Sequence, residues 1–193
     1  MIVLAIDTSL DACSVAILRD GVVLASCSEP MQRGQAERLA PMVQEIAQGA
    51  GIAFADLDRI AVTTGPGSFT GVRVGLSFAR ALALAVGKPC IGVSTLEALA
   101  LAEGRPGLRA ALIETPGAAY FALYENGIAR VAPQPIERGA QDALTPPGAA
   151  RIGPGVCVSA PALARYAAAL DPARYPPNPS YLRAALINAP GGA

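Results

Sequence analysis

The stretch from Val62 to Gly75, Val-Thr-Thr-Gly-Pro-Gly-Ser-Phe-Thr-Gly-Val-Arg-Val-Gly, constrains the fold more than any other part of the chain. It joins the most apolar strand candidate, residues 60–63, to the longest helix candidate, residues 68–87. Because proline lacks an N–H and glycine tolerates positive φ, Gly65-Pro66-Gly67 breaks the strand sharply. Ser68 or Thr70 can then cap the helix. The sequence therefore predicts a buried strand, a tight turn and a long helix.

A glycine loop that runs into a helix N-terminus can also hold phosphate, because it presents free backbone N–H groups and the positive end of the helix dipole. Asp7 ends the apolar run 2–6, and an acidic residue at the carboxyl end of a central strand lies where open α/β sheets place their ligands. The lysine of a P-loop is missing, and Arg73 lies inside the predicted helix instead. Asp7, Ser9, Gly65 and Gly67 are the candidate positions of a vestigial phosphate site.

Composition limits the function classes. The 193 residues include fifteen basic and fifteen acidic side chains, so no net field attracts nucleic acid or an anionic membrane. The chain has no histidine, which removes the commonest general base and metal ligand, and we expect no metal site. Uncharged windows fall short of the ~20 apolar residues of a membrane span, and the first residues lack the basic flank of a signal peptide. We expect a cytoplasmic protein with four reduced cysteines.

The order of elements suggests an internal duplication. In the first half, strands 2–6, 12–18 and 22–27 precede helix 35–50, strand 60–63, helix 68–87, strand 90–93 and a helix to residue 101. In the second half, strands 110–113, 119–124 and 128–132, a second Gly-Pro-Gly at 153–155 and helix 160–170 echo that order in shortened form. Two unrelated hairpins are the alternative. We expect a first domain over 1–104 and a second, degenerate domain with a proline-rich tail over 105–193.

Duplicated β-β-β-α-β-α domains with such an aspartate resemble the actin, sugar-kinase and Hsp70 group, in which the aspartate helps to hold a metal and a phosphate. The fold class we expect is therefore α/β, an actin-like (ribonuclease H-like) duplicated fold with mixed sheets. That group usually has glycine two residues after the aspartate, whereas this chain has Ser9, and the second-half counterpart of Asp7 is Glu114. A small-molecule kinase or ATPase of this group is one hypothesis for the function.

The helix over 68–87 is apolar on nearly every side, with a polar strip of only Arg73, Ser77 and Arg80. A helix that covers one face of a sheet needs one apolar face, so this helix must be buried on a second side. Gly71, Gly75 and Ala79 recur every four residues, which predicts a shallow groove for another helix. Either the second half of the chain or a partner protein covers this side, and we favour a partner protein.

The segment Gly65-Pro66-Gly67-Ser68-Phe69-Thr70-Gly71-Val72-Arg73-Val74-Gly75 closely resembles the TsaB (YeaZ) family. Ile6-Asp7-Thr8-Ser9 and Gly92-Val93-Ser94-Thr95-Leu96 extend the match, and Pro179-Ser180-Tyr181-Leu182-Arg183 resembles the family's C-terminal motif. Members of this family are non-catalytic subunits of the bacterial machinery that forms N6-threonylcarbamoyladenosine. The modification is at position 37 of tRNAs reading codons that start with A.

The resemblance implies a scaffold that pairs, through the first two helices of its first domain, with the catalytic paralogue TsaD, while the ATPase TsaE docks on the pair. It implies a homodimer when the chain is alone, contact with tRNA only through the complex, no membrane, and ATP and a metal used by the partner subunits rather than by this chain. The interface residues we expect are Leu39, Val43, Ile46, Thr70, Gly71, Arg73, Val74, Gly75, Phe78, Ala79 and Leu82.

Two departures from the family concern the second domain. Glu114-Thr115-Pro116 stands where the family commonly has Asp-Ala-Arg, and the second domain is shorter than usual. These departures put the docking of TsaE in doubt. An independent protease is a third hypothesis, although no nucleophile has a base beside it in the sequence.

Overall fold

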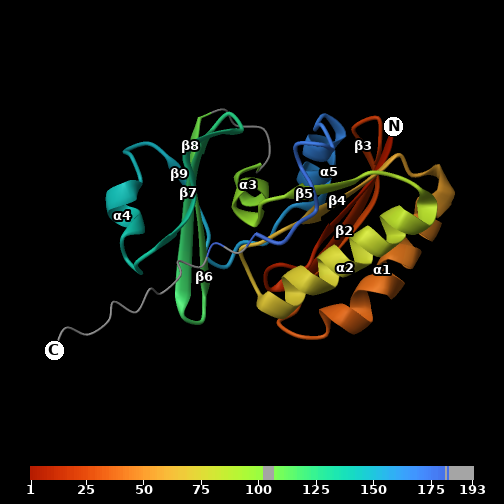
Figure 1. Ribbon diagram of the computed structural model, residues 1–193, viewed down its shortest axis with the longest axis horizontal. Helices are drawn as coiled ribbons and strands as arrows, with labels where there is room; N and C mark the ends of the chain where they lie inside the picture. The colour runs from red at the N-terminus through yellow and green to blue at the C-terminus, as the bar shows by residue number, and fades with distance from the viewer. Residues whose placement is uncertain (102–106, 181, 183–193) are drawn as a thin grey trace.

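The computed structural model describes residues 1–101, 107–180 and 182. Two sheets stand side by side with helices between them and on their outer faces (Figure 1). The first sheet has the order β3-β2-β1-β4-β5. Its strands are β1 (Ile2–Asp7), β2 (Ala12–Arg19), β3 (Val22–Pro30), β4 (Arg59–Thr63) and β5 (Cys90–Val93). The first three strands are antiparallel, whereas β4 and β5 run parallel to β1, so the sheet is mixed.

The second sheet repeats the first four strands of the first sheet. Its order is β8-β7-β6-β9, with β6 antiparallel to β7, β7 antiparallel to β8, and β6 parallel to β9. Its strands are β6 (Leu108–Thr115), β7 (Ala118–Glu125), β8 (Ile128–Ile136) and β9 (Ala150–Ile152). A cis Gly-Pro peptide follows both β4 and β9, at Gly65-Pro66 and Gly153-Pro154. The fold is thus the predicted actin-like duplicated α/β fold with a shortened second half.

The two hairpin turns are of the same kind. Asp20 and Gly21 have φ of 50° and 79°, and Asn126 and Gly127 have φ of 52° and 81°. Two consecutive positive φ angles are typical of the type I′ turn, whose twist matches that of the paired strands. Asp-Gly and Asn-Gly are the residue pairs that this turn favours.

The helices divide between the faces of the sheets. On the outer face of the first sheet lie α1 (Gln35–Gly49) and α2 (Phe69–Val86), separated in sequence by the short 3-10 helix η1 (Phe54–Asp56). Their apolar residues form one core with the sheet, which includes Leu4, Ile6, Leu39, Met42 and Leu76. The cap of α2 is Ser68, whose Oγ accepts a hydrogen bond from the Gly71 N–H at 3.2 Å.

Between the sheets, the two halves of the chain exchange helices. The first-half helix α3 (Thr95–Ala100) packs against β6 and β7, whereas the second-half helix α5 (Ala160–Ala168) packs against β1 and β2. Leu96, Leu99 and Leu163 are buried in the central core that results. The expected domain boundary at 104/105 falls in residues 102–106, outside the described residues, and stays a prediction.

Two elements of the second half escaped the sequence analysis. The helix α4 (Gln141–Leu144) and the strand β9 are four and three residues long, too short to leave a periodic pattern. The strand β8 also runs on to Ile136 through two prolines, which a strand tolerates because β8 lies at the edge of its sheet.

Within the described residues, α2 alone has the length and hydropathy of a candidate membrane span. Core helices of soluble proteins pass the same test. One third of this helix window is buried in the structure, where α2 packs against β4. Its hydropathy is therefore weak evidence for a membrane.

Candidate functional site

Asp7 lies at the carboxyl end of β1 and is fully buried. Its Oδ1 accepts hydrogen bonds from Ser9 Oγ at 2.5 Å, from Thr63 Oγ1 at 2.6 Å and from the Ser9 N–H at 3.1 Å. Its Oδ2 has no hydrogen-bond partner in the described part of the chain. Burial raises the pKa of Asp7, and the three hydrogen bonds lower it less. The carboxyl group thus joins the turn after β1 to the end of β4.

Two glycines of the loop and helix after β4, Gly67 and Gly71, lie very close to the turn after β1. A Cβ on Gly67 would lie 2.2 Å from the Ser9 carbonyl oxygen, and a Cβ on Gly71 would lie 2.0 Å from the Thr8 carbonyl oxygen. Thr8 Oγ1 donates a hydrogen bond to the Gly71 carbonyl at 2.7 Å, and the Ser68 N–H donates to the Ser9 carbonyl at 2.8 Å. The α2 N-terminus is therefore held directly on the turn after β1.

This arrangement brings Asp7, Ser9 and Gly67 together, and the Ser9 carbonyl occupies the space beside Gly67. The vestigial phosphate site stays a prediction. Gly65 has a φ of 95°, and a Cβ at this position would lie 3.4 Å from the Ser180 carbonyl oxygen. The second-half counterpart of Asp7, Glu114, is exposed instead of buried. The two halves therefore differ at the position that carries ligands in the open α/β sheet.

The sequence predicted a groove for another helix on the outer side of α2, and this prediction is wrong. Gly71, Gly75 and Ala79 face the sheet rather than solvent: a Cβ on Gly75 would meet Thr8 Oγ1 at 2.6 Å and Val62 Cγ2 at 3.5 Å, and Ala79 is fully buried. The small residues serve the close approach of α2 to the first sheet. Leu39 and Val43 of α1 are also buried in the chain's own core, so they have no surface for a partner.

The other expected interface residues keep exposed surface. Thr70 and Arg73 are exposed, and Ile46, Val74, Phe78 and Leu82 are half-buried. Phe69 is 63% exposed and Leu84 is 85% exposed, so both keep most of their apolar surface in water. We call Phe69, Thr70, Arg73, Val74, Phe78, Leu82 and Leu84 the α2 outer face.

The α2 outer face combines apolar and basic groups. The Arg73 guanidinium carbon lies 3.5 Å from the centre of the Phe69 ring, a cation–π contact at the first turn of α2. Sequence reasoning did not select Phe69 and Leu84. Their neighbours Arg73 and Arg80 could have indicated them, since residues three or four apart share a helix face.

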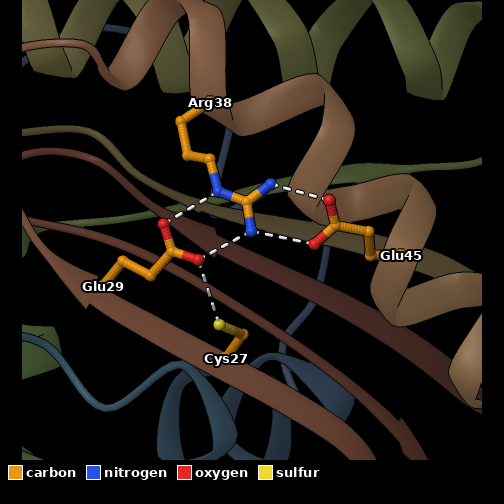
Figure 2. Close-up of polar contacts among 4 residues, drawn as sticks. All are labelled: Cys27, Glu29, Arg38 and Glu45. Carbon is orange, nitrogen blue, oxygen red and sulfur yellow. Dashed lines mark hydrogen bonds and ion pairs between the residues drawn. The ribbon is translucent and has the colours of Figure 1, made fainter.

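A polar cluster ties α1 to the edge strand β3 (Figure 2). Arg38 donates from Nε and Nη2 to Glu29, at 2.8 and 2.6 Å, and from Nη1 and Nη2 to Glu45, at 2.8 Å each. Hydrogen bonds from Arg38 lower the pKa values of both glutamates. Cys27 Sγ lies 3.8 Å from Glu29 Oε1. The cluster links α1 to β3 through Arg38 and Glu29.

No three His, Cys, Asp or Glu side chains lie together as a metal site needs, within the ranges that the structure describes. All four cysteines are free. Burial raises the pKa values of Cys13 and Cys90 to about 11, which keeps both as thiols.

Known proteins identify the family. A solved structure described as similar to peptidase YEAZ from Pseudomonas aeruginosa superposes with a TM-score of 0.77 at 30% identity, covering 94% of this chain and 99% of that one. The chain belongs to the TsaB (YeaZ) family. YeaZ from Pseudomonas aeruginosa superposes with a TM-score of 0.78 at 29% identity, over the same shares of the two chains.

TsaB relatives by sequence agree with the structural match. The tRNA threonylcarbamoyladenosine biosynthesis protein TsaB of Escherichia coli K12 is 44% identical over 135 residues, which make up 66% of this chain and 58% of the relative. The family model described as TsaD, tRNA N6-adenosine threonylcarbamoyltransferase, matches residues 28–120. A transferase of that name from Erythrobacter litoralis is 42% identical over 106 residues, 47% of this chain and 31% of the relative. The chain thus spans about a third to somewhat over half of these two curated relatives.

Proposed function

We propose that this chain is a non-catalytic subunit of the machinery that forms N6-threonylcarbamoyladenosine at position 37 of tRNAs reading codons that start with A. Two observations support the role: the full-length structural match to YeaZ, and the E. coli relative whose name states threonylcarbamoyladenosine biosynthesis. The match of residues 28–120 to the TsaD model indicates common ancestry with the transferase, and a shared fold favours pairing between the two.

In this proposal the chain binds a TsaD protein through α2 and α1, and TsaE joins the pair. ATP and a metal act on the partner subunits, tRNA is reached only through the complex, and the assembly works in the cytoplasm. The neutral overall charge is in keeping with indirect contact to tRNA, because a protein that grips the phosphate backbone by itself needs excess positive charge.

The observation that carries the pairing with a TsaD protein is the α2 outer face. Leu84 and Phe69 leave large apolar surfaces in water, although the opposite side of the same helix is packed to within contact of the sheet. Exposed apolar surface of this kind marks a protein interaction site more often than an isolated exposed leucine does. Without TsaD, the same face supports a homodimer.

The pairing can be tested by co-expression with the TsaD protein of the same organism. We expect the tagged wild-type chain to co-purify with TsaD, and Leu84→Asp and Phe78→Asp to weaken binding at least about 100-fold, because each places a charge in a desolvated interface. Ile128→Asp is the matched control, since Ile128 is 62% exposed on β8. Normal pairing of both α2 variants would show that the interface lies elsewhere.

A substitution at Gly75 would not test the pairing. A bulky residue at Gly75 would collide with Thr8 inside the protein, so its effect on pairing would report misfolding rather than the interface.

The homodimer can be tested by measuring the mass of the chain alone by light scattering. We expect a dimer of the wild-type chain at micromolar concentration, and a monomer for Leu84→Asp.

A second candidate function, a small-molecule kinase or ATPase, rests on Asp7 at the carboxyl end of β1 beside the glycine loop. Titration calorimetry of the purified chain with ATP and Mg²⁺ separates the two proposals. Saturable heat that disappears in Asp7→Asn supports the kinase, and an absence of heat removes it.

A further inference from the structure

The chain after α5, residues 171–180, runs along the ends of β4 and β5 in the first sheet, and we call it the strap. Figure 1 shows it as the last blue segment, which runs from α5 past β5 toward the second sheet. The Gly92 N–H of β5 donates a hydrogen bond to the Tyr175 carbonyl at 2.9 Å, and the Ser180 N–H donates to the Thr64 carbonyl at 2.8 Å. The strap thus binds β5, the edge strand, and the residue after β4.

Gly92 permits an unusually close approach of the strap. A Cβ at this position would lie 2.6 Å from the Pro176 carbonyl oxygen and 2.7 Å from Pro177 Cα, both backbone atoms. Gly65 lies near the Ser180 carbonyl in the same way. Both glycines are at the carboxyl ends of parallel strands, where open α/β sheets bind their ligands. In this protein the strap itself fills that place.

Aromatic side chains anchor the strap between the halves. Tyr166 of α5 donates a hydrogen bond to Glu97 Oε1 of α3 at 2.5 Å, and the Tyr175 hydroxyl lies 3.5 Å from the same oxygen. The rings of Tyr166 and Tyr175 meet edge to face with centroids 6.4 Å apart. At the start of the strap, Arg59 of β4 donates to the Ala167 carbonyl at 3.1 Å and to the Leu170 carbonyl at 2.5 Å. The strap thereby contacts both exchanged helices.

We propose that the strap is an intramolecular latch, which occupies the crevice at the carboxyl ends of β4 and β5 and holds the two halves in one arrangement. This inference goes beyond the proposed tRNA role and does not depend on it. Its basis is the pair of backbone hydrogen bonds, the close approach at Gly92 and the anchor formed by Glu97, Tyr166 and Tyr175.

The test displaces the strap by a single carbon. Because a Cβ on Gly92 would also lie 2.7 Å from Thr64 Cγ2, the background is Thr64→Ser, which removes that methyl group. Gly49→Ala in the same background is the matched control, since no atom lies within 4 Å of a Cβ there. The readout is trypsin cleavage after Arg174, an exposed residue within the strap, relative to the same bond in the urea-unfolded chain.

We expect Gly92→Ala to speed this cleavage about tenfold over the Thr64→Ser background, because overpacking against backbone atoms shifts the opening equilibrium by that order. The Gly49→Ala control should cleave at the background rate. Equal rates in all three proteins would overturn the latch.

A second variant keeps the proposal falsifiable if Gly92→Ala does not fold. Tyr175→Ala removes the anchor of the strap without changing the sheet, and we expect faster cleavage after Arg174 than in Ile128→Ala, whose substitution lies on the distant β8. Hydrogen exchange of residues 171–180 gives an independent measurement: faster exchange confined to the strap and β5 supports the latch, and unchanged exchange contradicts it.

Discussion

At the scale of single residues, Gly71 and Gly75 of α2 allow the helix to approach Thr8 closely. Glycine inside a helix ordinarily costs about 1 kcal/mol relative to alanine. Gly71 and Gly75 lie inside α2, yet the carbonyl and hydroxyl oxygens of Thr8 occupy the positions next to their absent Cβ atoms. The close contact between α2 and the turn after β1 explains why the chain carries this cost.

Gly71→Ala separates the two effects. Helix propensity alone would stabilise the protein by about 1 kcal/mol. A Cβ 2.0 Å from the Thr8 carbonyl oxygen must instead displace backbone, so we expect a net loss of about 2 kcal/mol or more in the free energy of unfolding. Urea denaturation measures it, with Gly49→Ala as the control that has open space. A gain in stability at both positions would contradict the contact.

Glu97 gives the protein a dependence of stability on pH. Burial raises the pKa of Glu97 in the folded protein above its ordinary value, and the hydrogen bonds from Tyr166 and Tyr175 lower it less. A group with a raised folded pKa stabilises fully below its unfolded pKa, and that contribution disappears as the pH rises through the folded pKa. Stability attributable to Glu97 therefore falls with rising pH across this window.

Glu97→Gln should remove that fall, because the amide does not titrate. The measurement is the difference in unfolding free energy between wild type and Glu97→Gln as a function of pH. Asp7 has a raised pKa too, but it is present in both proteins and cancels in the difference. A difference that does not vary with pH would mean that Glu97 has an ordinary pKa.

At the scale of elements, α2 belongs to the core on one side and to the surface on the other. Its buried residues pack against β4 and β1, while Phe69 and Leu84 remain exposed. The sequence predicted its bounds well, since Ser68 and Gly87 are typical of helix ends, and Gly87 has the expected left-handed φ of 67°. It also predicted burial of a second side of the helix, which the described residues leave exposed, so that this part stays a prediction.

The sequence analysis predicted the wrong side of α2 to face outward. Periodicity places Gly71, Gly75 and Ala79 on one line, but the same line of small residues suits close packing against a sheet or against another helix. Only the position of Thr8, which is distant in sequence, decides between them. The candidate site has the same limit: Asp7 and Thr63 were separate strand ends in the sequence, and their hydrogen bond depends on the parallel pairing of β1 with β4.

The N-terminal cap of α2 can be tested by substitution, because the sequence left two candidates for it. Ser68 and Thr70 were both candidate caps, and the structure gives the capping bond to Ser68. Ser68→Ala should cost about 1 kcal/mol in unfolding free energy. Thr70→Ala, on the exposed first turn, should change it by less than about 0.5 kcal/mol. Equal losses in thermal melts of the two variants would contradict the assignment.

At the scale of the whole molecule, the halves share one central core. The first sheet needs α5 from the second half to cover its inner face, and the second sheet needs α3 from the first half. The sequence predicted the duplication, because turns and strand order repeat locally. It did not predict the exchange of helices, which depends on contacts between residues more than a hundred positions apart, such as Arg59 with Ala167.

Separated halves should therefore not fold alone. We expect a fragment of residues 1–101 to bind the dye ANS and to lack a cooperative melting transition, because the inner face of its sheet stays in water. Mixing it with a fragment of residues 107–193 should restore cooperative melting. A cooperative transition in the isolated first fragment would contradict the need for α5.

The helix exchange also sets the order in which the protein can mature on the ribosome. The five strands of the first sheet are complete once Val93 has been made, but the helix that covers their inner face ends only at Ala168. Throughout the synthesis of the intervening residues, β1 and β2 present one apolar face to solvent or to a chaperone. The first half, although synthesised first, completes its fold last.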